Sequence, residues 1–265
     1  MTEVIDKKAE RQARKEQRQL INAARGMRSK MIRFCQDERF AQAFGKALPL
    51  YWNNFYDLTC ADEMDMNESL RFFDWFFFDY QDEALDKRLV EYFAEEKRED
   101  VSEKELTVID GWVDSPATSA YEFVDFDAIN ARFKLKDFFT EEEVIAFSPA
   151  GFGQSKRGDL ILVRILPVGS DKIFSTVGVF LPQDEIKDLR EKMDAALEAD
   201  KEAHPEGTHN GFLRRNNHLI THHVLDQAID AGRFAVSRFD PTRMDKAVKR
   251  AGKKIVGKFK RKKKK

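Results

Sequence analysis

Hydrophobic residues recur at helical spacing up to about residue 105, alternate with polar residues from there to about residue 182, and return to helical spacing afterwards. Periods of about 3.6 and 2 residues are typical of half-buried helices and strands, respectively. The pattern predicts an α+β protein with an N-terminal helical half, a small five-stranded antiparallel sheet or barrel, C-terminal helices and a basic tail. The predicted segments are a basic helical arm (1–19), an aromatic-rich helical region (20–105), a small β domain (106–182), a helical region (183–240) and the basic tail (241–265).

The stretch Leu70–Tyr80 holds seven aromatic side chains in eleven positions. In a helix, Phe72, Phe76 and Tyr80 share one stripe, and the other rings widen it until most of the helix surface is apolar. The pattern predicts a buried aromatic helix in the N-terminal half. An aromatic platform for base stacking is the alternative, but the carboxylates of Asp74 and Asp79 disfavour it because they repel phosphates.

Five strands are predicted between turn signals. The fourth contains the run Leu160–Leu166, which is apolar on both faces and is therefore expected at the centre of the sheet. Helices are predicted before the sheet at Asp82–Lys97 and after it on both sides of Pro205–Gly207. The five predicted strands are Ala120–Asp125, Ala131–Asp137, Val144–Ser148, Asp159–Pro167 and Lys172–Leu181.

The composition is that of a globular protein, with 265 residues of which 42% are hydrophobic. No stretch approaches the roughly 20 apolar residues that a membrane-spanning helix needs. The segment Met1–Arg18 has no apolar core of the kind found in secretory signals. Cys35 and Cys60 are too few for a zinc site and are expected to be reduced thiols. We therefore expect a cytoplasmic protein with no transmembrane segment.

A net charge of −1 conceals a strong segregation of charge along the chain. The segment Lys7–Arg33 holds ten basic and two acidic residues and carries +8, and Arg243–Lys265 holds thirteen basic residues and one acidic and carries +12. The remainder therefore carries −21. The charge pattern predicts an acidic body with two basic arms.

Basic arms of this density attract polyanions, and each neutralised phosphate steepens the salt dependence of binding. We therefore predict a non-enzymatic accessory protein that binds RNA, DNA or a ribosome through its ends. No catalytic residue and no cofactor are predicted. The predicted nucleic-acid-binding residues are Lys7, Arg11, Arg14, Lys15, Arg18, Lys249, Arg250, Lys253, Lys254, Lys258, Lys260, Arg261 and Lys262.

Other interpretations of the arms remain open. The tail could only increase solubility, or it could lie on an anionic membrane with Val248, Val256 and Phe259 on its apolar face. Gly252 and Gly257 weaken such a helix, and the N-terminal arm has no apolar face that could enter lipid. An adaptor that recruits a protein through the acidic body, with the tail as tether, is the main alternative function, and an enzyme of unknown class is the third.

All five histidines lie between His204 and His223. His218 and His222 are four residues apart on one predicted helix face, with Asp226 one turn further on, a spacing that could bind a metal. The glutamate that would follow the first histidine in a zinc-protease motif is absent. Surface histidines without a metal are therefore favoured over a metal site formed by His218, His222 and Asp226.

The order of several motifs resembles one family. Tyr51-Trp52 and an acidic linker precede the aromatic run Arg71–Tyr80, and a β segment with Arg157-Gly158-Asp159-Leu160 through Arg164 follows. This order, over about residues 47–181, is similar to the body of bacterial proteins that often end in a SEC-C zinc motif. The cysteine cluster of that motif is missing here, so the resemblance implies no zinc site and little about activity.

Overall fold

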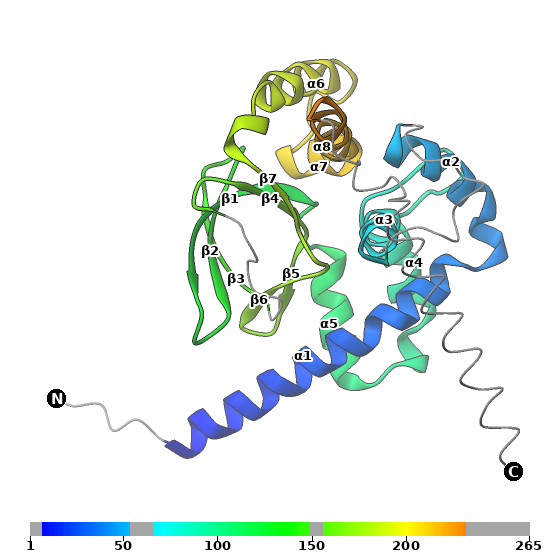
Figure 1. Ribbon diagram of the computed structural model, residues 1–265. Helices are drawn as coiled ribbons and strands as arrows, with labels where there is room; N and C mark the ends of the chain where they lie inside the picture. The colour runs from blue at the N-terminus through cyan, green and yellow to red at the C-terminus, as the bar shows by residue number, and fades with distance from the viewer. Residues whose placement is uncertain (1–6, 54–65, 149–155, 232–265) are drawn as a thin grey trace, which may run out of the picture.

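The computed structural model describes residues 7–53, 66–148 and 156–231, and the outline is that of an α+β protein (Figure 1). Helices lie around one curled sheet, with α1 running beneath it and α6–α8 above it in this view. The helices are α1 (Lys7–Cys35), α2 (Ala41–Trp52), α3 (Met66–Phe78), α4 (Leu89–Glu96), α5 (Glu103–Val113), α6 (Leu189–Ala203), α7 (His209–Asn216) and α8 (His218–Asp230).

The sheet has seven described strands in the order β5-β6-β3-β2-β1-β4-β7. All neighbours are antiparallel except β3 and β6, which pair in parallel at Phe147 and Ile173. The strands are β1 (Ser119–Asp127), β2 (Arg132–Asp137), β3 (Glu143–Phe147), β4 (Leu160–Val163), β5 (Ile165–Val168), β6 (Asp171–Phe174) and β7 (Val179–Leu181).

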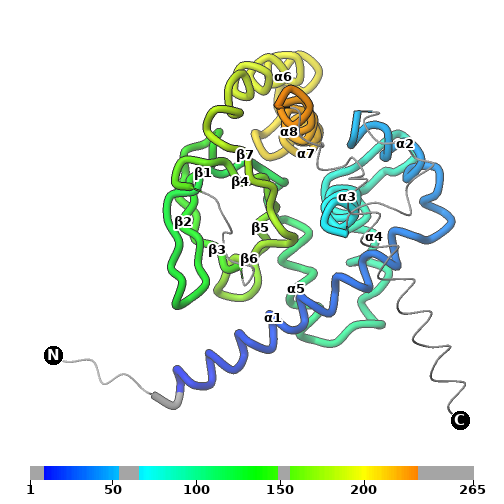
Figure 2. The backbone as a smooth tube through the Cα atoms, in the orientation of Figure 1, coloured from blue at the N-terminus to red at the C-terminus, as the bar shows by residue number. Residues whose placement is uncertain are grey.

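The prediction of five antiparallel strands was therefore wrong. The fourth predicted strand divides at Arg164 into β4 and β5, and the fifth divides after Phe174 into β6 and β7. Both breaks occur at one place in space, where the Ser175 amide donates a hydrogen bond to the Arg164 carbonyl at 2.9 Å. The chain passes there from one end of the sheet to the other, as the backbone path in Figure 2 shows. A curled sheet permits this passage, because its two ends approach each other.

The apolar character of β4 has the predicted cause. Leu160 and Leu162 pack against α6–α8, whereas Ile161 and Val163 point into the hollow of the curled sheet. Beyond the break, Leu166 packs into the core of the helical half. Each face of this segment is covered, so it shows no alternation of polar and apolar residues.

The aromatic stretch is buried as predicted. Helix α3 ends at Phe78, two residues before the predicted end, and Tyr80 follows outside the helix. Phe76 is 0% exposed and stacks in the core with Phe72, their ring centroids 5.8 Å apart at an interplanar angle of 11°. Rings from α2 pack over this helix: the Trp52 ring stacks on that of Phe72, with ring centroids 4.8 Å apart.

The predicted helix Asp82–Lys97 is too long at its start, because α4 begins at Leu89. The Asp82 carboxylate accepts a hydrogen bond from the Ala84 amide at 2.9 Å, which favours a turn over a helix. The helix cap lies six residues after Asp82, at Arg88, whose backbone amide donates a hydrogen bond to the Glu91 carboxylate at 2.9 Å. None of the helices in the described part of the chain is long and apolar enough to cross a membrane.

We predict that Phe76→Ala lowers the free energy of unfolding by about 3–5 kcal/mol, because truncating a fully buried ring leaves a cavity among rings that relax only partly. Urea denaturation followed by circular dichroism measures the effect. Ile129→Ala is the control, since Ile129 is 95% exposed and its truncation should leave stability unchanged. An unaltered midpoint for Phe76→Ala would contradict the packing described for α3.

Candidate functional site

The first turns of α1 carry a basic face. Arg11, Arg14, Lys15 and Arg18 follow one another at helical spacing of three and four residues, so their side chains share one side of the helix. All four are exposed. The core residues Ala24, Met27 and Met31 lie on the other side of the same helix. The sequence prediction of a basic N-terminal helix is thus confirmed for these four positions.

Little negative charge opposes this face. Glu10 lies 3.9 Å from Arg14 in an ion pair between exposed side chains, which contributes little. Within the described part of the chain, no carboxylate forms an ion pair with Arg11, Lys15 or Arg18. Their positive charge is therefore available to a partner.

The end of the basic face is fixed to the sheet by Gln17. Its side-chain amide donates to the Val168 carbonyl at 2.7 Å and accepts from the Ser170 amide at 3.1 Å. Gly169 between them has a φ of 59°, and a Cβ there would lie 2.4 Å from the Gln17 oxygen. A residue without a side chain is thus required for the close approach of α1 to the β5–β6 turn.

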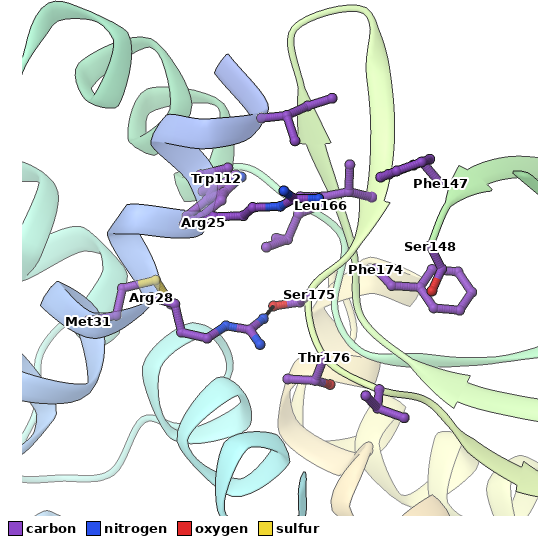
Figure 3. Close-up of a pocket in the computed structure, with 14 residues that line it drawn as sticks. Arg25, Arg28, Met31, Trp112, Phe147, Ser148, Leu166, Phe174, Ser175 and Thr176 are labelled. Atoms are coloured by element: carbon purple, nitrogen blue, oxygen red, sulfur yellow. Dashed lines mark hydrogen bonds between the residues drawn. The ribbon is translucent and has the colours of Figure 1, made fainter. Parts of the chain in front are cut away.

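Two further arginines of α1 face a pocket between this helix and the sheet. Arg28 donates to the Ser175 hydroxyl at 3.4 Å, and Arg25 extends toward the same space (Figure 3). The pocket has a volume of about 260 Å³. The prediction of binding residues did not include Arg25 or Arg28, because it treated only the first nineteen residues as the arm.

Behind the pocket lies a buried ionic cluster centred on Arg164, which is 1% exposed. Its guanidinium pairs with the Asp79 carboxylate, donates to the Pro116 carbonyl at 2.6 Å and lies 4.7 Å from the centre of the Phe78 ring. Asp79 also accepts from the Asn217 amide at 2.7 Å. Arg164 therefore joins α3, the segment after α5, the sheet and the α7–α8 junction.

Asp74 is the second carboxylate of the cluster. It accepts from the Ser175 hydroxyl at 2.6 Å and lies 3.7 Å from the Arg164 Nε. Burial raises the pKa of Asp74, while the charges of Arg164 and Arg28 act in the opposite direction. The sequence analysis missed this cluster, although an arginine inside an apolar run and aspartates inside an aromatic run were visible signals of buried ion pairing.

The remaining predicted binding residues are Lys7 and the positions in the tail. Lys7 begins α1, and nothing is described of its side chain. The tail positions Lys249, Arg250, Lys253, Lys254, Lys258, Lys260, Arg261 and Lys262 lie outside the described residues. The structure therefore bears only on the N-terminal arm.

The two histidines of the hypothetical metal site do meet, with ring centroids 5.2 Å apart. His222 Nε2 is 2.8 Å from the Leu50 carbonyl, to which it donates, and Asp226 lies 3.5 Å from the Lys192 ammonium. Burial, aided by His222, lowers the pKa of His218 to about 4. Over residues 7–53, 66–148 and 156–231, no three histidine, cysteine or acidic side chains are arranged to hold a metal.

Comparison with known families gives a match over most of the chain. Residues 11–210 match the family described as "Family of unknown function (DUF7986)". The chain belongs to this family. Comparisons with curated proteins and with solved structures gave no significant match.

The DUF7986 region contains the basic face from Arg11 onward, the pocket and Arg164, and ends before the basic tail. The resemblance to SEC-C-associated proteins stays a prediction.

We predict that Arg164→Met destabilises this DUF7986 protein by about 3–5 kcal/mol, because it leaves the buried carboxylates of Asp79 and Asp74 without their cation. Adding Asp79→Asn should restore part of the loss. Arg157→Met is the control, since Arg157 pairs with Asp125 at the surface and its loss should cost less than about 1 kcal/mol. Urea unfolding of the wild type and these three variants tests this, and equal losses for Arg164→Met and Arg157→Met would contradict it.

A second prediction concerns acid stability. The folded-state pKa of His218, about 4, lies below the usual value of about 6.5, so the unfolded chain binds the proton first as the pH falls. Stability present above about pH 6.5 is then lost progressively toward pH 4, and this residue should account for on the order of 1–2 kcal/mol between pH 7 and pH 5. His218→Gln should reduce this loss, and His204→Gln, at an exposed ring, should not. An identical pH dependence in the wild type and His218→Gln would refute the assignment.

Proposed function

We propose that this protein is a non-enzymatic accessory protein of the cytoplasm that binds nucleic acid or a ribosome through its basic ends. The observation that supports the proposal is the exposed basic face formed by Arg11, Arg14, Lys15 and Arg18 on a helix already fixed to the body. Electrostatic attraction of this kind supplies most of the sequence-independent affinity for nucleic acids.

The geometry of the face suits a phosphate backbone. From Arg11 to Arg18 the helix rises by about 10 Å, and duplex DNA carries one negative charge per about 1.7 Å of axis. Several phosphates can therefore lie opposite the four cations at once. A helix of this diameter also fits the major groove of DNA, and nothing in the face favours one base over another.

Anchoring of the helix favours binding. The hydrogen bonds from Gln17 to the β5–β6 turn hold the last of the four cations in place before a partner arrives. Ordering of the helix then costs less free energy on binding than ordering of a free arm would. The tail Arg243–Lys265, with a charge of +12 in its sequence, would add further phosphate contacts.

The alternative function is a protein adaptor. Outside the two basic segments the chain carries −21, which would suit a basic protein partner, with the tail as tether to an anionic surface. In that case a protein and no nucleic acid would co-purify with the chain, and nuclease treatment would not change the result.

We predict that the variant with Arg11, Arg14, Lys15 and Arg18 changed to Gln binds labelled RNA and DNA less tightly at low salt. The plot of log K against log salt should become less steep, its negative slope shrinking in magnitude by about 3–4, because up to four phosphate contacts are lost. Deleting Arg243–Lys265 as well should reduce the affinity and the salt dependence of binding further. Fluorescence anisotropy over a salt series measures the change.

The control variant has the same change in charge at four exposed lysines elsewhere, namely Lys172, Lys187, Lys192 and Lys201. It should retain the affinity and slope of the wild type. If both quadruple variants lose affinity equally, net charge alone explains binding and the α1 face is not the site. If neither the face nor the tail affects binding, the proposal is wrong.

A further inference from the structure

The pocket between α1 and the curled sheet has both polar and apolar lining residues. The polar ones are Arg25 and Arg28 from α1 together with Ser148, Ser175 and Thr176, which directly follow strands β3 and β6 (Figure 3). The apolar ones include Trp112, Phe147, Leu166, Ile173 and Phe174. A mainly apolar wall with a few convergent polar groups is the usual composition of a small-molecule site.

Arg28 is placed to bind an anion. Ser175 donates its hydroxyl hydrogen to Asp74 at 2.6 Å, so the hydroxyl oxygen receives the Arg28 guanidinium at 3.4 Å. This long contact uses one of the five N–H groups of a guanidinium. In the described part of the chain, no carboxylate lies within ion-pair distance of Arg28. The other donors can therefore reach a ligand.

The local charge balance also favours an anion. Asp74 and Asp79 lie behind the pocket wall, and both are within 4 Å of the Arg164 guanidinium. Among the described residues that line the pocket, Arg25 and Arg28 are the ionisable ones. Three arginines thus face two carboxylates, and the pocket retains a net positive charge that a single negative group would balance.

The apolar lining residues suit a flat ring. Trp112 donates its indole N–H to the Pro167 carbonyl at 3.0 Å, so the rest of the ring acts as an apolar surface. The volume of about 260 Å³ equals that of on the order of nine waters at about 30 Å³ each. A ligand of on the order of ten non-hydrogen atoms therefore fits in this space.

We propose that this pocket binds a compact aromatic carboxylate, with its carboxylate on Arg28 and its ring against Trp112, Phe147 and Phe174. Arg25 stands at the exposed side of the pocket and adds long-range attraction. The proposal is independent of nucleic-acid binding, because it uses neither the Arg11–Arg18 face nor the tail.

The test is isothermal titration of the full-length protein with 3-phenylpropionate. We expect one site per chain with a dissociation constant between about 10 μM and 1 mM, in the range open to a ligand of this size. Two matched compounds separate the contributions: 3-phenylpropan-1-ol keeps the ring without the charge, and acetate keeps the charge without the ring. Both should bind at least about tenfold more weakly.

Two variants locate the site. Arg28→Gln should weaken binding by about ten- to a hundredfold, as expected for loss of a charged hydrogen-bond donor. Arg33→Gln, an exposed arginine on the same helix outside this pocket, should bind like the wild type. If Arg28→Gln does not fold, Arg25→Gln at an exposed position replaces it and should weaken binding by about two- to fivefold.

Three results would overturn the proposal. The first is absence of saturable binding up to about 10 mM of 3-phenylpropionate. The second is equal affinity for the acid and the alcohol, which would leave Arg28 without a role. The third is unchanged affinity in a folded Arg28→Gln variant. None of these results bears on RNA or DNA binding, which is measured separately.

Discussion

Arg164 sits almost completely out of water, where an isolated guanidinium would cost several kcal/mol. It is tolerated because Asp74 and Asp79 from the end of α3 and the Pro116 carbonyl from the segment after α5 converge on it. The charge can be buried only when all of these elements are in place. The helical half, the sheet and the C-terminal helices are therefore coupled through one side chain.

The same residue marks the place where the sheet curls. The chain leaves β4 at Arg164 and resumes as β5 at the other end of the strand order, and the sheet must curl to allow it. The curl leaves a hollow on one side, which part of the sheet's own core fills. It also leaves the space beside α1 in which Arg25 and Arg28 lie.

The positive charge of α1 is divided between two environments. Arg11 to Arg18 lie on an exposed face suited to a large polyanion, whereas Arg25 and Arg28 lie beside an apolar pocket suited to a small anion. Gln17 is the boundary, because the helix contacts the β5–β6 turn there. One helix thus offers two anion-binding surfaces of different size, and each can be tested without the other.

By itself the sequence determined what depends on local pattern. Helical periodicity, charge segregation and the density of aromatic side chains were enough to predict the α+β class, the basic face at Arg11 to Arg18 and the burial of Phe72 and Phe76, because spacing alone decides which side chains share a face.

Only the tertiary structure decided the rest. It divided two apolar runs into four strands and brought Asp74 and Asp79 to Arg164, which lies 85 residues beyond Asp79 along the chain. It also brought Arg28 to Ser175, 147 residues away. Such contacts depend on how the sheet curls and on the cost of burying charge, and neither is encoded in the spacing of neighbouring residues.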